Sequence, residues 1–387
     1  MIYITLKKPP KAIQFSFEDM LFGVNPEKFN LEIKDTHDTR TYVYESTPQN
    51  LLEKVDIINM IQILEDFCIR YAELIGTEDK STLYRSFKIP KRSGGLRQIN
   101  APEGELMTAL RELKFILEQK LYANYHTTAF AYVKGRSTID AVKRHQQNKS
   151  RWFLKLDFHD FFGSTTLEFV MQQMETIFPF NEILKSERGR AAIKSALSLC
   201  FLNGGLPQGT PISPTLTNLM MIPFDHQLAK AMREHTPHIC YTRYADDLLL
   251  SSDLSFKWTE VQQQVIDLLK QINAPFQLNT SKTRYGSSAG RNWNLGVMLN
   301  KDNEITIGHS KKKLLKAMLY NFMNDYTNNR IWNLEDVQVL NGQISYYKMV
   351  EKENIEQILN TYSNKFNLSV MGAIKQILTH NVMSNAS

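Results

Sequence analysis

Three acidic residues stand inside segments whose apolar composition is typical of buried strands. Asp157 lies in the Phe- and Leu-rich run WFLKLDFHDFF (152–162). Asp246 and Asp247 interrupt HICYTRYADDLLLSS (238–252), where two β-type runs favour a strand–turn–strand hairpin. Burying an ionised carboxylate is costly unless a cation neutralises it. A fold for this chain must therefore bring positive charge to these three side chains.

Divalent cations suit such a group of carboxylates. Hard oxygen ligands favour Mg²⁺, which keeps coordination positions open for substrate phosphates. Two such ions about 3.5–4 Å apart activate a 3′-hydroxyl and stabilise a departing pyrophosphate. Asp157, Asp246 and Asp247 therefore predict a site for two Mg²⁺ ions, with Mn²⁺ as a substitute. These residues alone leave an alternative open, in which Asp246-Asp247 is a turn dipeptide and Asp157 ends a strand.

The rest of the chain predicts an α+β architecture. Apolar residues at helical spacing predict helices over 51–74 and 103–122, and the chain from about 311 onward is mostly helical. FKIPKRSGGLRQINAP (87–102) predicts a hairpin with a Gly-rich turn. Residues 1–50 mix short β-type runs with Pro, Asp, Thr and Asn and predict an irregular N-terminal extension. Helices beside separate antiparallel strands indicate a palm-like fold, not an alternating βα fold.

Composition narrows the setting in which such a chain would work. A length of 387 residues suggests two or three subdomains, and 42% hydrophobic residues can form a sizeable core. The net charge of +6 permits a polyanionic partner without requiring one. The three cysteines include no CxxC pair, which argues against a disulfide framework or a structural zinc site. Without a membrane-spanning run or a secretory signal, we expect no membrane partner and a reducing cytoplasm.

Six blocks, in one order, resemble those of the reverse transcriptase family. They are FKIPKRSGGLR (87–97, the fingers motif), DFHDFF (157–162, the first aspartate motif), GLPQGTPISPTLTN (205–218, the LPQGxxxSPxxxN block), YADD (244–247, the YxDD signature), LNTSKT (278–283) and LG (295–296). Any one block is weak evidence, but six in order over about residues 85–300 identify the chain as a member of this family.

The resemblance implies a nucleotidyltransferase, an RNA-directed DNA polymerase, with a right-hand fold. This α+β fold has fingers, a palm built from an antiparallel sheet with helices, and a helical thumb. We expect an N-terminal extension at 1–50, fingers at 51–150, a palm with the catalytic carboxylates at 151–300, and the thumb at 301–387. Fingers and palm are interleaved in this expectation.

By the same resemblance, the acidic residues hold metal and a basic hairpin holds the triphosphate. Asp157 and Asp246 would bridge the two Mg²⁺ ions, and Asp247 would complete the carboxylate cluster. Lys91 and Arg97 flank a Gly-Gly turn that could fold over the incoming nucleotide, with Arg as a planar fork and Lys as a mobile charge. A solvated basic hairpin is the alternative for both residues.

Further nucleotide contacts follow from the matching positions of other blocks. Phe162 matches the steric gate that would clash with a 2′-hydroxyl, although core packing with Phe161 is an alternative. Gln208 would touch the nucleotide or template, and Lys282 would protonate the leaving pyrophosphate or contact it electrostatically. The alignment around Pro90-Lys91-Arg92 is uncertain by one residue, and Lys88 is a competitor for the role of Lys91.

The primer and the nucleic-acid backbone have their own candidates. Tyr244, Leu295 and Gly296 would position the primer end, with core packing as the alternative for Tyr244. A group of lysines in the C-terminal part would follow phosphates of a template–primer duplex, or else simply be solvated. These lysines are Lys311, Lys312, Lys313 and Lys316.

Within the family, the blocks are closest to retron and phage-defence reverse transcriptases. Two elements depart from the retron pattern: DAVKRH (140–145) where retrons carry NAxxH, and NLG (294–296) where they carry VTG. Both elements are associated with retron RNA recognition. We therefore predict an antiphage-defence enzyme, outside the standard retrons, that uses dNTPs to copy a structured non-coding RNA into DNA.

Several alternatives stay open at this stage. The chain could be a standard retron reverse transcriptase, or a template-independent polymerase of the abortive-infection type that primes from its own tyrosine. A catalytically silent nucleic-acid-binding scaffold is the alternative from another class. An effector protein or a second copy of the chain are further candidate partners. The sequence identifies neither the template RNA nor the primer source.

Overall fold

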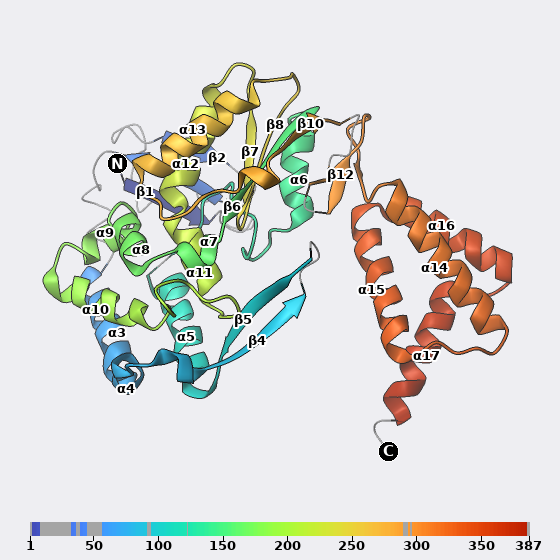
Figure 1. The fold of residues 1–387 in the computed structure, drawn as a ribbon, viewed down its shortest axis with the longest axis horizontal. Helices are drawn as coiled ribbons and strands as arrows, with labels where there is room; N and C mark the ends of the chain where they lie inside the picture. Colours follow the sequence, from blue (N-terminus) through green and yellow to red (C-terminus); the bar gives the residue numbers. More distant parts are fainter. Residues whose placement is uncertain are drawn as a thin grey trace, which may run out of the picture. The chain divides into compact units, whose positions relative to one another are not determined.

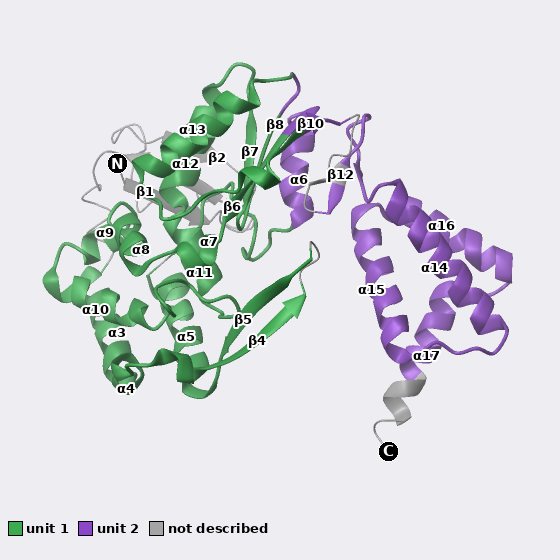
Figure 2. Ribbon diagram, in the orientation of Figure 1, with its two compact units in different colours: residues 1–137, 154–251, 255–285 green, residues 138–153, 252–254, 286–387 purple. Residues whose placement is uncertain are grey.

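Two compact units divide the chain (Figure 2). The computed structural model describes residues 2–7, 32–35, 39–44, 56–90, 94–121, 123–288, 293–294 and 296–384. Unit 1 consists of Met1–Ser137, Leu154–Ser251 and Ser255–Tyr285, and unit 2 of Thr138–Phe153, Ser252–Leu254 and Gly286–Ser387. Because the units interleave along the chain, the linear division into extension, fingers, palm and thumb stays a prediction. In the described residues, no helix has the length and apolar character needed to cross a membrane.

A five-stranded sheet carries the segments with the acidic residues. Its strands are β6 (Trp152–His159), β7 (Cys240–Tyr244), β8 (Asp247–Ser252), β9 (Gln277–Leu278) and β10 (Arg284–Ser287). The order is β10-β6-β8-β7, with β9 beside β6. β7 and β8 form the predicted hairpin, and Tyr244 pairs with Asp247, so that Ala245 and Asp246 make a two-residue turn.

The end of β6 is anchored by an aromatic core. Neighbouring side chains on a strand point to opposite faces, so Phe158 and Asp157 lie on different sides of the sheet. The Phe158 ring stacks on Phe161 with centroids 5.3 Å apart and contacts Phe276 at 5.0 Å and Phe224 at 6.1 Å. This packing fixes the strand that carries Asp157.

Helices cover the sheet of unit 1, and α12 packs against β7 and α13 (Figure 1). The α-helices of this unit are α3 (Ile57–Arg70), α4 (Ala72–Gly76), α5 (Gly104–Phe115), α7 (Phe161–Ser164), α8 (Leu167–Met174), α9 (Phe180–Ile183), α10 (Glu187–Ser198), α11 (Ser213–Met220), α12 (Ile222–Glu234) and α13 (Trp258–Gln271). Shorter helical turns are η2 (Lys80–Leu83), η3 (Ile116–Lys120) and η4 (Thr280–Lys282).

Three predicted elements differ in detail from those observed. The helix expected over 51–74 is interrupted at Tyr71, where the chain leaves α3 and restarts as α4; residues 51–55 lie outside the described ranges. The helix expected over 103–122 ends in the π-helical turn η3. The strand expected over 152–162 ends at His159, since the chain turns into α7.

The fingers hairpin forms as predicted, from β4 (Tyr84–Pro90) and β5 (Leu96–Pro102), with Ile89 opposite Arg97. It is a separate two-stranded sheet. The expectation of an irregular N-terminal extension was wrong for the residues described there. β1 (Ile2–Lys7), β2 (Glu32–Asp35) and β3 (Thr39–Tyr44) form a sheet in the order β1-β3-β2, because the short β-type runs pair with each other.

Unit 2 joins a small sheet and helix α6 to a helical bundle. Its elements are α6 (Thr138–Gln147), β11 (Trp293–Asn294), β12 (Val297–Leu299), β13 (Ile305–Thr306), α14 (His309–Thr327), α15 (Leu334–Val350), α16 (Lys352–Phe366) and α17 (Val370–Ser384). The bundle buries an apolar cluster that includes Leu315, Phe322 and Ile344. The mostly helical chain expected after residue 311 is confirmed (Figure 1).

Candidate active site

The sheet brings the segments with the three acidic residues to one place. Asp157 lies on β6, Asp246 in the β7–β8 turn, and Asp247 at the start of β8. Backbone hydrogen bonds lock this arrangement: Phe158 N donates to Asp246 O at 3.1 Å, and Asn279 N donates to Asp157 O at 2.7 Å. Residues far apart in sequence therefore form one acidic cluster, which we define as Asp157, Asp246 and Asp247.

The acidic cluster is electrostatically strained. Burial raises the pKa of Asp246, and the negative charges of Asp247 and then Asp157 raise it further. Burial also raises the pKa of Asp247, although the nearby Lys155 ammonium opposes this shift. Ionised carboxylates in such surroundings are stabilised by nearby positive charge. The cluster is therefore suited to bind cations.

Two lysines pair with the cluster in the structure. Lys282 Nζ donates to Asp157 Oδ1 at 2.8 Å and Oδ2 at 3.1 Å, and Lys155 Nζ lies 3.0 Å from Asp247 Oδ1. The hydrogen bond to Asp157 raises the pKa of Lys282. In the part of the chain that the structure describes, no three His, Cys, Asp or Glu side chains are arranged to hold a metal ion. The three carboxylates of the acidic cluster nevertheless supply the oxygen ligands that divalent ions prefer, and the lysine that pairs with Asp157 is half-exposed.

The LPQG turn packs on the segment that follows Asp157. Leu206 N donates to Phe162 O at 2.9 Å, and a Cβ on Gly205 would lie only 2.0 Å from Gly163 O. Gly209 has φ +113°, and a Cβ there would come within 3.0 Å of Asn100 O. Both glycines thus allow close backbone approach, as the sequence indicates. The backbone that each glycine approaches belongs to another segment of the protein, at Gly163 for Gly205 and at Asn100 for Gly209.

The fold gives the neighbouring residues Phe161 and Phe162 different surroundings. Phe161 is 2% exposed and belongs to the aromatic core, whereas Phe162 is only half-buried, with its ring 5.6 Å from that of Phe161. Gln208 is also half-buried, and its carbonyl accepts a hydrogen bond from Asn100 N at 2.8 Å. Phe162 is therefore free to contact a substrate in a way that Phe161 is not.

The basic hairpin and the primer candidates are described only in part. Arg97 and Lys88 are exposed on β5 and β4, while Lys91 lies outside the described residues. Tyr244 is half-buried at the end of β7. Of the last block, Leu295 lies outside the described residues.

The basic positions of unit 2 fall into two kinds. Lys311 Nζ donates to Gly296 O, and Lys312 Nζ donates to Glu351 Oε1 at 2.7 Å, so these two side chains have partners inside the unit. Lys313 and Lys316 are exposed one helical turn apart on α14. Of the four predicted lysines, this second pair is the more exposed, and its contact with phosphates stays a prediction.

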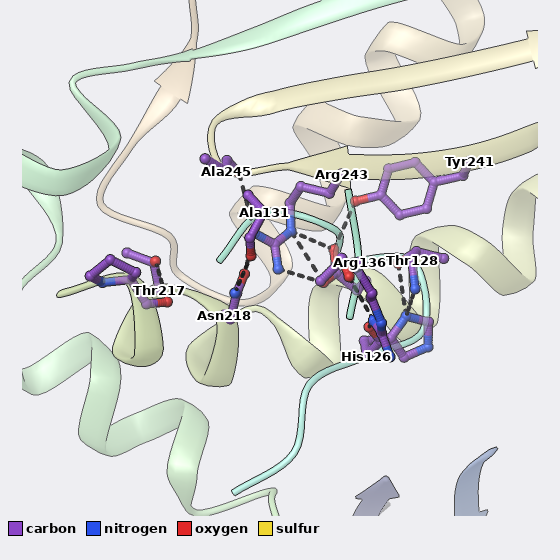
Figure 3. A network of polar contacts seen from close by, with 12 residues as sticks. His126, Thr128, Ala131, Arg136, Thr217, Asn218, Tyr241, Arg243 and Ala245 are labelled. Carbon is purple, nitrogen blue, oxygen red and sulfur yellow. Dashed lines mark hydrogen bonds and ion pairs between the residues drawn. The ribbon is translucent and has the colours of Figure 1, made fainter. Parts of the chain in front are cut away.

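Sequence reasoning missed a buried ion pair next to the turn that carries Asp246; Figure 3 shows its arginine, Arg243, among the surrounding polar contacts. Arg243 on β7 and Asp225 on α12 are both fully buried, and Arg243 Nη2 donates to Asp225 Oδ2 at 2.7 Å. The signal was present, because Arg243 is a charged residue inside the same apolar run as Asp246. The YxDD signature includes the aspartates but begins one residue after Arg243, so it did not mark this arginine.

Tyr132 is a second residue that no sequence block marked. Its backbone φ of 60° lies in the left-handed region, which is rare for an aromatic residue, and its side chain is exposed. Partial desolvation raises the pKa of Tyr132, and the negative charge of Asp246 contributes. A strained residue beside the acidic cluster is a candidate for substrate contact.

Comparison with known proteins places this site in a family. Residues 89–339 match the model of the family described as reverse transcriptase (RNA-dependent DNA polymerase). The Ec83 retron reverse transcriptase of Escherichia coli is 28% identical over 291 residues, which cover 73% of this chain and 88% of the relative. The Mx65 retron reverse transcriptase of Myxococcus xanthus is 29% identical over 305 residues, covering 75% of this chain and 66% of the relative.

Among solved structures, apo telomerase from Candida tropicalis covers 92% of this chain and 71% of its own, with a TM-score of 0.44 and 13% identity. A TM-score of this size does not by itself indicate a shared fold.

The chain belongs to the reverse transcriptase family. It is an RNA-directed DNA polymerase with the α+β right-hand fold of fingers, palm and helical thumb, and its template partner is RNA. Within the family it is a bacterial, retron-like reverse transcriptase. The prediction of an enzyme is thereby confirmed, and the silent scaffold is set aside. Members of this family generally use divalent metal ions.

Proposed function

We propose that the chain extends a DNA strand on an RNA template by nucleotidyl transfer that requires two Mg²⁺ ions held by Asp157, Asp246 and Asp247. The observation that supports this proposal is the acidic cluster itself, in which burial and like charges raise the pKa of Asp246. The ions, when bound, supply activation of the 3′-hydroxyl and neutralisation of the triphosphate charge.

The chain's own residues have separable roles in this proposal. Lys282, which pairs with Asp157 and is half-exposed, would donate a proton to the leaving pyrophosphate. Arg97, together with Lys91, binds triphosphate oxygens from the fingers hairpin. Phe162 excludes a 2′-hydroxyl by steric contact with the sugar.

Primer extension on a defined RNA template tests the metal assignment. We expect Asp157→Asn and Asp246→Asn each to lower nucleotide addition by at least about 10³-fold, because each removes a ligand needed at the transition state. Asp267→Asn, a change on the exposed face of α13 in the same unit, is the matched control and should retain activity. Wild-type extension by either site variant would overturn the assignment.

We further propose that the template is a structured non-coding RNA encoded beside the gene, and that copying it serves antiphage defence. A standard retron role is the second candidate, and the retron relatives favour it. The shifted histidine of DAVKRH also bears on this choice: His145 is fully buried and packs on Phe153 with ring centroids 6.4 Å apart. Its displacement from the retron pattern is therefore a change in a protein core, which weakens the argument for a different RNA.

Nucleic acid that copurifies with the protein from its native locus tests the template. A single neighbouring RNA joined to its DNA copy supports the proposal, and random cellular RNA contradicts it. DNA covalently attached to a tyrosine would instead support the protein-primed alternative. Phage plating with and without the locus tests the defence role, and equal plaque counts would contradict it.

A further inference from the structure

Arg243 is a fully buried cation whose nearest neighbours include the turn of the acidic cluster. Its Nε donates to Asp225 Oδ1 at 2.9 Å and to Oδ2 at 3.1 Å, while Nη2 donates to Oδ2 at 2.7 Å. Tyr241, two residues earlier on β7, donates its hydroxyl to Asp225 Oδ1 at 2.7 Å. One edge of the guanidinium is thus fully used in holding α12 to β7 (Figure 3).

The other edge of the guanidinium faces the turn. Arg243 Nη1 donates to Ala245 O and to Asn218 Oδ1, each at 3.2 Å. Asn218 in turn donates from Nδ2 to Ala131 O at 2.8 Å. Only a planar side chain with donors on two edges can join a carboxylate on one side to two carbonyl-type oxygens on the other.

The segment before the palm is tied to the same point. Arg243 N donates to Thr128 O at 2.8 Å, and Phe130 N donates to Arg243 O at 2.9 Å. Arg136 donates from Nη1 to the carbonyls of His126 and Ala129. Segment 126–136, helix α11 and helix α12 therefore all meet at one residue of β7.

The turn held in this way has an unfavourable backbone conformation. Ala245 has φ +56°, which is left-handed, and a residue with a Cβ adopts it only when its surroundings enforce it. Ala245 is buried, and the next residue is Asp246. The conformation of Ala245 therefore contributes to the direction in which Asp246 and Asp247 leave the turn.

We propose that Arg243 is a positioning residue, which holds the Ala245 turn between Asp225 and Asn218 so that the carboxylates of Asp246 and Asp247 face Asp157. The inference rests on the proposed role of those three aspartates. It also gives a role to Asn218, the last residue of the LPQGxxxSPxxxN block, because this side chain connects Arg243 to Ala131.

Binding of Mn²⁺ alone, followed by electron paramagnetic resonance on the purified protein, tests the proposal without relying on activity. Arg243→Lys keeps the charge opposite Asp225 but cannot reach both edges. We expect the half-saturating Mn²⁺ concentration to rise about tenfold and kcat for nucleotide addition to fall about tenfold, as for other residues behind metal ligands. The KM for the template–primer should stay near the wild-type value, because no nucleic-acid contact is lost.

Tyr241→Phe is the matched control. It removes a hydrogen bond to the same Asp225 but touches neither Ala245 nor Asn218. It should lower the melting temperature and leave Mn²⁺ binding unchanged. If Arg243→Lys lowers only the melting temperature in the same way, Arg243 is merely structural and the proposal is wrong.

Asn218→Ala serves as the second variant if Arg243→Lys does not fold, since it leaves Arg243 paired with Asp225. We expect a smaller rise in the half-saturating Mn²⁺ concentration, and wild-type binding would contradict the proposal. Asp246→Asn separates this question from the site assignment. If Asp246→Asn is active, the metal site itself is wrongly assigned; if it is inactive while the Arg243 and Asn218 variants bind Mn²⁺ normally, only the positioning role fails.

Discussion

Two carboxylates of unit 1 form ion pairs in contrasting ways. Asp225 and Arg243 are both 0% exposed, and the arginine fork binds both carboxylate oxygens. Asp157 is 8% exposed, but its partner Lys282 is 54% exposed and holds it with a single ammonium group. The first pair is closed to solvent on both sides, and the second is open on the side of the lysine.

The difference shows that Arg243 is a permanent cation, whereas Lys282 is a replaceable one. A buried charge that loses its partner leaves an unpaired ion in a medium of low polarity, which is strongly unfavourable. A half-exposed lysine can return to water, so its own departure costs little, provided that another cation then neutralises the buried Asp157. The fold thus fixes Arg243, the charge that shapes the turn. It leaves Lys282 exchangeable at the site where metal ions are proposed to bind.

The largest expected effect on the free energy of unfolding concerns the fully buried pair of Arg243 and Asp225. Asp225→Asn should lower the free energy of unfolding by about 3–5 kcal/mol, because Arg243 then remains buried without a counter-charge. Asp157→Asn should lower it by no more than about 1 kcal/mol, because its lysine is free to reach water. Urea unfolding in the presence of EDTA measures the free energy of unfolding of both variants. Equal losses in Asp225→Asn and Asp157→Asn would remove the contrast between the two ion pairs.

His145 extends the comparison to a buried group that has to stay neutral. Burial lowers the pKa of His145 to about 3, below an ordinary value near 6.5. The unfolded chain therefore takes up a proton between these pH values and the native chain does not, so this contribution to stability is present at neutral pH and falls as the pH falls through that window.

The expected loss from this histidine is about 2 kcal/mol between pH 7 and pH 5. His145→Gln should flatten that part of the dependence of unfolding free energy on pH. Urea titrations at several pH values compare the variant with the wild type. The same slope in both would show that other groups govern the acid side.

The two neighbouring phenylalanines offer a smaller effect. Phe162→Ala should raise ribonucleotide incorporation relative to deoxynucleotide incorporation by at least about tenfold, because a ring that blocks the 2′-hydroxyl is removed. The ratio of kcat/KM values for the two nucleotides measures this. Phe161→Ala, in the aromatic core, should instead reduce stability and serves as the contrasting variant. Unchanged sugar discrimination in Phe162→Ala would refute the gate.

The smallest effect concerns the replaceable cation. Lys282→Met should lower the free energy of unfolding by less than Asp225→Asn does, because the lysine itself is half-exposed although Asp157 is buried. It should strengthen Mn²⁺ binding a few-fold, because the lysine no longer competes for Asp157. Lys257→Met, which removes an exposed ion pair with Glu260, is the control. Weaker Mn²⁺ binding in Lys282→Met would show that Lys282 supports the metal site instead of competing for it.

The sequence alone indicated the family of this protein and several of its elements, among them the fingers hairpin, the β7–β8 hairpin and the C-terminal helices. Charged residues in apolar runs, together with the family resemblance, indicated the acidic cluster, because a buried charge is unfavourable unless a partner neutralises it. The order of the blocks identified the reverse transcriptase family, and the two β-type runs on either side of the Ala245 turn predicted the β7–β8 hairpin. Local signals were sufficient for these conclusions.

Only the tertiary structure decided how these parts support one another. The partner of Asp157 is Lys282, 125 residues away, and the partner of Arg243 is Asp225, 18 residues away on another element. Likewise, Lys312 pairs with Glu351 while Lys313 is exposed, although the two are adjacent in sequence. Local patterns fix what each segment can form, but pairing between distant side chains depends on how helices and strands pack, and that is settled by the whole chain.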